Sequence, residues 1–281
     1  MKKRGILAVN LAVLLFGLAG LFAKWIRLPA IAITFGRVLF SSLALGLYLL
    51  LRRQSVRVAR PGDRLLLAAA GGILALHWWA FLQSVQLSSV AIGTITFSSF
   101  PLFVTFLEPL LFRQKLERRN VFIALLILIG VLITVPEFSL DNHVFAGILI
   151  GMLSALAYAV LTLINKKLAG SLSGTVTAFW EQASAALVLL PLMLTVQVRP
   201  TLPDLALLLG LGVITTALAH TLFISSLKTL PAQLAGVCSS LETVYGILFA
   251  LLLLGEIPTL REILGAVIIV GAVIAAQLRA K

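Results

Sequence analysis

Two charged side chains lie deep inside apolar runs of the chain, where a charge usually faces a cavity or a partner. Glu242 is about eleven residues into the run 231–254, which at about 1.5 Å per helical residue is near mid-membrane depth. Its carboxylate could hold a substrate ammonium, carry a coupling proton, or form a structural ion pair. Arg37, in the run 29–51, could bind a substrate carboxylate through its guanidinium fork, pair with an acid, or reach outward to water.

Two further acids lie nearer the ends of their apolar runs. Glu181 occupies a place in the run 174–196 that nearly matches that of Arg37, displaced towards the cytoplasm. Glu108 ends a stripe of residues at helical spacing, which also holds Thr94, Phe97, Pro101 and Thr105. We expect this stripe to face a cavity, unless Glu108 simply reaches the headgroup layer.

Aromatic residues form a third group of candidates. His77 and Trp78 lie in the middle of the run 65–86, with Phe81 one turn later, although tryptophan prefers the membrane interface. An aromatic wall with a polar tip suits an aromatic or cationic ligand, and the alternative is core or lipid-facing packing. Three weaker candidates for the same cavity are Tyr158, Trp180 and Tyr245.

Composition decides which solvent surrounds these side chains. Of the 281 residues 60% are hydrophobic and 11% are charged, and the mean hydropathy is +1.12. A water-soluble fold cannot hide so much apolar surface, so the sequence predicts an all-α membrane protein. The net charge of +12 lies in short loops, which argues against a nucleic-acid partner. Cys238 is the single cysteine, and no spacing suggests a metal site, a cofactor site or an enzyme.

Ten apolar runs are long enough to cross a bilayer. They are 5–23, 29–51, 65–86, 89–112, 119–136, 144–165, 174–196, 204–225, 231–254 and 261–279. With the N-terminus in the cytoplasm, 17 of the 22 Lys and Arg residues fall on the cytoplasmic side. We therefore expect a multi-pass inner-membrane protein with both termini cytoplasmic, whose first run is a span rather than a cleaved signal peptide.

The second half of the sequence repeats the first. At an offset of 141–142 positions, Lys24 meets Lys166 and Ser98-Ser99 meets Ser239-Ser240. The predicted halves are residues 1–139 and 140–281, each with five spans. Because five is odd, the second half must enter the membrane upside down, which is an arrangement of many secondary transporters. Lys24 and Lys166 are then expected at opposite membrane faces, with their amines extended to the interface.

Several local patterns resemble the EamA-type members of the drug/metabolite transporter superfamily. They are Phe16-Gly17 followed by Lys24, Pro29 and Arg37; Phe100-Pro101 to Phe112-Arg113; and Ser239 to Gly246 followed by Leu254-Gly255-Glu256. One departure is Leu241-Glu242-Thr243, because the family often has Leu-Glu-Pro there. The resemblance implies a central cavity lined by spans one to four and six to nine, with spans five and ten peripheral.

The sequence thus predicts a secondary transporter, an exporter of small organic metabolites such as amino acids, working by alternating access. Its partners are the bilayer, a small-molecule substrate and a coupling proton, and it is a monomer or a homodimer. A multidrug or cationic-compound transporter is the alternative within the same class. A non-transporting scaffold or sensor and an intramembrane enzyme are the alternatives outside it, and no nucleophile–base set supports the enzyme.

Overall fold

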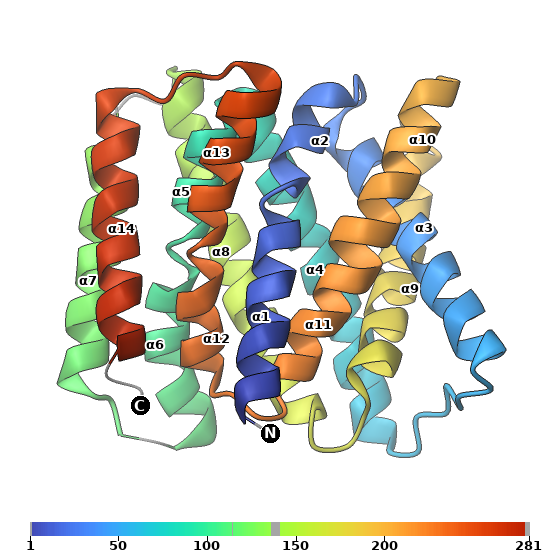
Figure 1. Cartoon of the computed structure of the whole chain (residues 1–281). Coiled ribbons are helices and arrows are strands. Elements are labelled where there is room, and N and C mark those ends of the chain that lie inside the picture. The colour runs from blue at the N-terminus through green and yellow to red at the C-terminus, as the bar shows by residue number, and fades with distance from the viewer. Residues whose placement is uncertain (1, 114, 136–140, 279–281) are drawn as a thin grey trace.

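The computed structural model describes residues 2–113, 115–135 and 141–278, and within these ranges every regular element is a helix. Eight helical stretches are long and apolar enough to cross a membrane, and in Figure 1 they run between two common ends of a bundle. These stretches are Lys3–Trp25, Ala30–Leu51, Pro61–Leu87, Val90–Phe112, His143–Leu168, Gly174–Met193, Leu202–Ser226 and Ala232–Leu254. The protein is therefore a multi-pass membrane protein.

Two further helices occupy the other predicted runs. They are α7 (Arg118–Ile133) and α14 (Leu260–Leu278), which pack against each other at one edge of the bundle (Figure 1). α7 has 16 residues, fewer than a bilayer crossing normally needs. The count of ten spans remains a prediction. The predicted boundary at 139/140 lies outside the described residues.

The remaining helices follow the eight stretches in chain order. Four of the stretches are single helices, and the other four are divided into segments. The helices are α1 (Lys2–Phe16), α2 (Ala19–Trp25), α3 (Ala30–Leu51), α4 (Pro61–Leu87), α5 (Val90–Phe97), α6 (Phe100–Phe112), α8 (His143–Leu168), α9 (Gly174–Met193), α10 (Leu202–Gly210), η1 (Leu211–Leu218), α11 (Ala219–Ser226), α12 (Ala232–Ser239) and α13 (Glu242–Leu254). α1 begins and α14 ends at the same end of the bundle (Figure 1).

Two helix interruptions meet inside the bundle. α5 gives way to α6 at Ser98-Ser99, and α12 gives way to α13 at Ser240-Leu241, where the backbone forms tighter i→i−3 bonds. Thr243, which stands where the family often has proline, donates to the carbonyl of Thr94 at 3.0 Å and also bonds the Ser98 hydroxyl. The α12–α13 interruption therefore forms without a proline, and hydroxyl groups fasten the two broken helices together.

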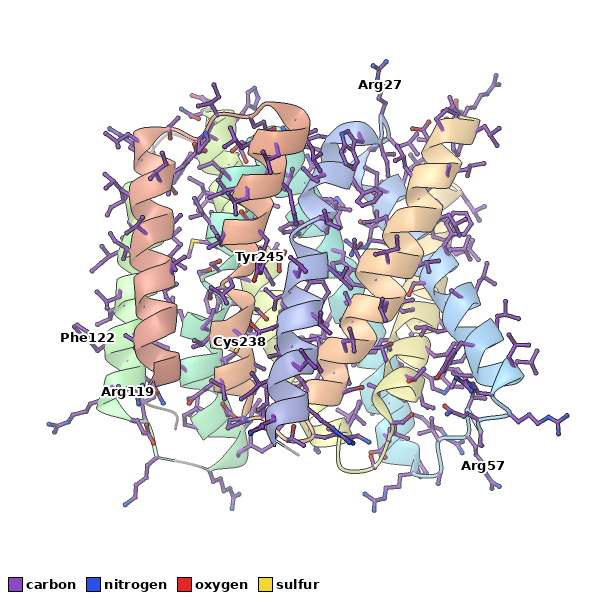
Figure 2. All side chains as sticks on the ribbon, in the orientation of Figure 1. Arg27, Arg57, Arg119, Phe122, Cys238 and Tyr245 are labelled. Carbon is purple, nitrogen blue, oxygen red and sulfur yellow. The ribbon has the colours of Figure 1, made fainter. Side chains whose placement is uncertain are left out.

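Small residues allow the helices to approach closely, as in other membrane bundles. A Cβ added at Gly71 of α4 would lie 2.8 Å from the backbone nitrogen of Ala185 in α9. At Gly151 of α8 it would overlap Thr96 of α5. The outside of the bundle is rich in exposed leucines, such as Leu50 at 73% and Leu187 at 70%, which suits lipid rather than water. Figure 2 shows the side chains of the whole bundle, with Arg57 and Arg119 towards one end and Arg27 at the other.

Each end of the bundle holds a lysine that turns inward. Lys24 of α2 donates to the carbonyl of Ser88 at 2.9 Å, and its amine lies 3.8 Å from the carboxylate of Glu256. Glu256 in turn accepts from the backbone N–H of Val90, the first residue of α5, at 3.1 Å. We call these four residues the outer seal, because the topology predicted from sequence places this end on the outer side of the membrane. Lys24 was expected to extend its amine to the interface; the amine caps the carbonyl at the end of α4, and the side chain remains 27% exposed.

A second cluster of the same kind lies at the opposite end, and we call it the inner seal. Lys166 of α8 donates to the carbonyls of Leu227 and Leu230, each at 2.7 Å, so it too turns inward. The carboxylate of Glu108 faces Lys166 and the backbone N–H groups of Ala232 and Gln233 at the start of α12. Both seals thus tie a lysine, a helix end, a helix start and a glutamate together.

Candidate functional site

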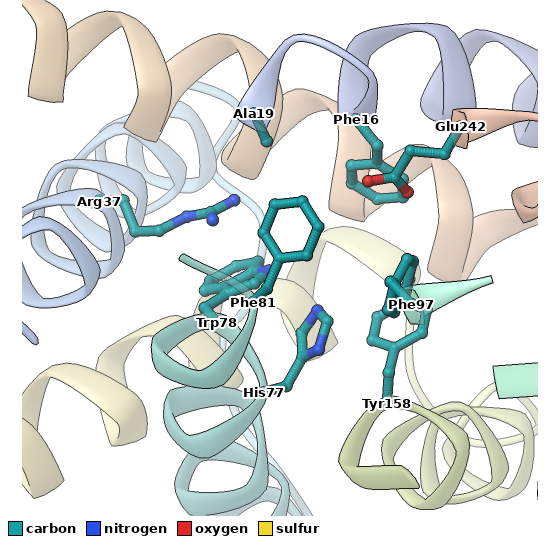
Figure 3. Close-up of a pocket in the computed structure, with 9 residues that line it drawn as sticks. All are labelled: Phe16, Ala19, Arg37, His77, Trp78, Phe81, Phe97, Tyr158 and Glu242. Carbon is teal, nitrogen blue, oxygen red and sulfur yellow. The ribbon is translucent and has the colours of Figure 1, made fainter. Parts of the chain in front are cut away.

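Nine side chains surround a small cavity in the middle of the bundle (Figure 3). They come from α1, α3, α4, α5, α8 and α13 and the start of α2, and each is less than a tenth exposed. The lining residues are Phe16, Ala19, Arg37, His77, Trp78, Phe81, Phe97, Tyr158 and Glu242. The cavity offers about 20 Å³ to the centre of a water molecule, which is room for roughly one water. A molecule larger than water therefore fits only when the surrounding helices move apart.

The Arg37 guanidinium approaches the cavity from α3. Its Nε donates to the Thr216 hydroxyl at 3.1 Å, and its central carbon lies 3.9 Å from the centre of the Trp78 ring. Thr216 belongs to η1, a π-helical segment, and its hydroxyl donates to the carbonyl of Leu211 five residues earlier. π-helical turns often occur at functional sites. The buried Nη1 of Arg37 has no hydrogen-bond partner, which leaves donors for an incoming acceptor.

Glu242 reaches the cavity from the opposite side (Figure 3). It is the first residue of α13, directly after the interruption at Ser240-Leu241. The positive end of the helix dipole favours a carboxylate at that position. Arg37 and Glu242 interact electrostatically across the cavity. A zwitterion bound between them would place its carboxylate at Arg37 and its ammonium at Glu242.

An aromatic wall separates these two charges. The His77 ring lies 4.6 Å from Tyr158 and 5.2 Å from Phe97, centre to centre, and Phe81 meets Phe97 edge-on at 5.8 Å. Ser154 of α8 donates to the His77 carbonyl at 3.0 Å and lies 2.8 Å from His77 Nδ1, so that nitrogen acts as the donor. The wall is therefore rigid on the α4–α8 side. Its ring faces suit apolar, aromatic or cationic groups.

Six of the ten residues proposed from sequence line this cavity, and four lie elsewhere. Trp180 donates to the carbonyl of Val56 at 2.8 Å near the loop after α3. Tyr245 stacks with Phe249 and packs on Gly17. Glu108 belongs to the inner seal. Glu181 is buried behind the cavity. Spans seven and eight contribute no lining side chain, contrary to the arrangement implied by the resemblance.

Glu181 forms a buried pair with His220. The two side chains are fully buried, and His220 Nε2 donates to Glu181 Oε2 at 2.7 Å. The His220 ring meets the Trp78 ring edge-on at 5.6 Å, so the pair lies directly behind the cavity wall. Glu181 Oε1 and His220 Nδ1 have no hydrogen-bond partner.

Two lining residues, Phe16 and Ala19, and the partner of Glu181 were not among the candidates, and Phe97 was expected at a cavity only as part of a stripe. Phe97 lies on the stripe that ends at Glu108, and Phe16 precedes Gly17, so both carried a sequence signal. Ala19 had no such signal, because alanine is common in apolar runs and this residue contributes only its small side chain at the start of α2. Within the described part of the chain, no group of three His, Cys, Asp or Glu residues could hold a metal ion.

Comparison with known proteins defines the class of molecule that this bundle and cavity represent. Residues 3–135 and 145–276 each match the EamA-like transporter family, and the chain belongs to that family. It is therefore a membrane transporter of the drug/metabolite transporter superfamily.

Individual relatives are similar over nearly the whole chain. A pseudopaline exporter, CntI, from Pseudomonas aeruginosa (strain UCBPP-PA14) is 28% identical over 276 residues, covering 97% of this chain and 95% of the relative. An S-adenosylmethionine uptake transporter from Rickettsia bellii is 25% identical over 247 residues, covering 88% and 83%. A solved crystal structure shares the fold with a TM-score of 0.77 at 19% identity, covering 100% of this chain and 99% of that one. The two named relatives are transporters rather than enzymes.

Proposed function

We propose that this protein is a secondary transporter that exports small organic metabolites, amino acids or related compounds, by alternating access. Its two halves, residues 1–139 and 140–281, are inverted five-helix repeats that together give ten spans. Both termini lie in the cytoplasm, and the membrane is the bacterial inner membrane. The central cavity is where the two halves meet.

The two seals support the inverted repeat. Lys166 lies 142 positions after Lys24, and Leu230 lies 142 positions after Ser88. Ala232, likewise, lies 142 positions after Val90. Equivalent residues thus perform equivalent tasks at opposite ends of the bundle, as an upside-down second copy requires. The separate family matches to residues 3–135 and 145–276 support the same division.

The observation that carries the mechanism is the buried cavity between two closed seals. Each seal joins the halves: the outer one links α2 and α5 to Glu256, and the inner one links α8 and α12 to Glu108. Opening the outer seal alone would admit water from one side, and opening the inner seal alone from the other. The described conformation is then the occluded intermediate of alternating access.

The lining of the cavity supports the substrate class. An amino acid would bind Arg37 with its carboxylate and Glu242 with its ammonium, and its side chain would lie on the ring faces of Trp78 and Phe81. Relatives act in both directions, since one is an exporter and another an uptake transporter. Export is proposed because the exporter relative matches 97% of the chain.

A cationic compound is the second candidate substrate. Five aromatic side chains line the cavity beside Glu242, and cations bind aromatic faces. A non-transporting scaffold or sensor would have no need for seals at both ends.

Thermal-shift screening of the purified protein with amino acids, nucleosides, polyamines and cationic drugs tests the proposal first. A ligand that binds only the folded state raises the melting temperature. Each stabilising compound is then followed as radiolabel in proteoliposomes, where counterflow against the same unlabelled compound is expected. Loss of counterflow in Arg37→Ala or Glu242→Gln supports the site. If no stabilising compound crosses the liposome membrane, the protein is a sensor or scaffold.

A further inference from the structure

Resting on the transport function proposed above, we infer that the buried His220–Glu181 pair is a proton-binding site that loses its proton when a monocation occupies the cavity at Glu242. The pair lies behind Trp78 and outside the cavity, so a substrate does not touch it. This arrangement separates the proton from the substrate-binding residues.

The pair has the chemistry of a proton site. Its 2.7 Å bond has the length of a charge-assisted hydrogen bond between imidazolium and carboxylate. Glu181 Oε1, His220 Nδ1 and both amide atoms of Gln182 are buried without hydrogen-bond partners. Buried polar atoms normally find partners, so these free positions leave the pair able to accept or donate one more hydrogen bond.

Electrostatic balance explains why the pair would hold one proton. The charged side chains buried around the cavity in the described structure are Arg37, Glu181 and Glu242. With neutral histidines their formal sum is one negative charge, and an uncompensated charge inside a membrane protein is costly. One added proton brings the sum to zero, and we place it on the His220–Glu181 pair because that pair has the short 2.7 Å bond. A monocation at Glu242 does the same, which makes the proton superfluous.

The groups that face the pair connect it to the cavity. From α4, Trp78 contacts the His220 ring, and the same indole lies against Arg37 of α3. His77 of α4 interacts electrostatically with both His220 and Arg37, and Tyr158 of α8 with both Glu181 and Glu242. α1 has titratable side chains only in its first turn, and η1 has none. One layer of side chains separates the cavity from the pair, so a charge that enters the cavity interacts electrostatically with His220 and Glu181.

The inference distinguishes two kinds of ligand by charge. A monocation releases the proton to water on the side to which the cavity opens, so transport exchanges one cation for one proton. A zwitterion adds no net charge, and the proton stays on the pair. Phenyltrimethylammonium and phenylalanine are matched probes, because both offer an aromatic ring and the first has a charge that does not titrate.

The test measures proton release and locates the proton. Purified protein in weakly buffered detergent solution with a pH indicator is expected to release about one proton per bound phenyltrimethylammonium and none with phenylalanine. The chain has three histidines, so ¹⁵N-histidine labelling gives few signals to assign. The His220 signal, identified by its loss in His220→Gln, should change from imidazolium to neutral when the cation binds. The His143→Gln variant is the matched control, since that residue lies at the start of α8.

Two variants separate coupling from binding. Glu181→Gln and His220→Gln are expected to bind phenyltrimethylammonium and to show its counterflow, but to lose accumulation driven by a pH gradient. Proton release without any change at His220 would overturn the inference and would indicate Glu242 as the proton site. The inference also fails if the cation does not bind, or if it binds and no proton is released. If wild-type protein releases the proton but moves no compound across liposomes, the transport proposal fails and the proton site stands.

Discussion

Removing the lysine of one seal should bias the transporter towards opening at that end. Lys24→Met removes two interactions of the outer seal. The hydrogen bond from the charged amine contributes about 1.5 kcal/mol net to holding the seal closed. The partly exposed ion pair contributes about 0.5 kcal/mol. Lys166→Met removes two hydrogen bonds of 2.7 Å from the inner seal, which together stabilise the closed seal by about 3 kcal/mol or more. Every 1.4 kcal/mol is tenfold in population. We expect about 30-fold more opening at the outer end in the first variant and more than about 100-fold at the inner end in the second.

Cysteine accessibility measures these populations. Cys238 is the single native cysteine and is 3% exposed, so Cys238→Ala provides a background for Ala19→Cys in the cavity. A membrane-impermeant thiol reagent is applied to right-side-out and to inverted vesicles. Lys24→Met should accelerate labelling from one side and Lys166→Met from the other. Lys167→Met is the matched control, because Lys167 is exposed and belongs to neither seal. Acceleration from the same side by both variants, or by neither, would refute the reasoning.

Three smaller changes test other parts of the structure. Arg37→Lys should weaken binding of an amino-acid ligand at least about tenfold in equilibrium binding, because lysine cannot reproduce the fork that Thr216 and Trp78 hold in place; unchanged affinity would remove Arg37 from carboxylate binding. Gly71→Ala should lower the free energy of unfolding by about 1–3 kcal/mol, seen as reduced thermal stability, because its Cβ would overlap the backbone of α9. Thr201→Val should cost about 1 kcal/mol by removing the capping box at the start of α10, and an unchanged melting temperature would contradict that role.

The sequence predicted the charged and aromatic parts of the cavity because charged residues, and aromatic residues with a polar tip, are rare in the middle of apolar membrane spans. Glu242, Arg37 and His77 stand out in apolar runs, and the structure brings them to one cavity. Helical spacing also indicated the stripe with Phe97, although the other four members of that stripe are not among the lining residues. Each of these predictions needed only depth and periodicity, which the sequence records directly.

Other features depended on the rotation and packing of whole helices. Glu181 turns towards His220 rather than to the cavity, because α9 packs against both α4 and α11. The lysines of the seals turn inward since free carbonyls at neighbouring helix ends are within reach. The π-helical turn that orients Thr216 has no signal in residue type, because threonine is common in ordinary spans. Such details are fixed by neighbours that lie far away in the sequence.

The pairing of α7 with α14 has a mechanical consequence. These helices contribute no lining residue to the cavity, and they cross at Gly130 and Gly265, where an added Cβ on Gly265 would come within 2.6 Å of the Gly130 carbonyl oxygen. The side chains of Ile269 and Thr134 also pack at this crossing, so the two helices form one closely packed pair. This flank can then stay in place while the cavity-lining helices move, and both open states would share it. A bulky residue at this crossing would affect both open states alike, leaving the balance between them unchanged.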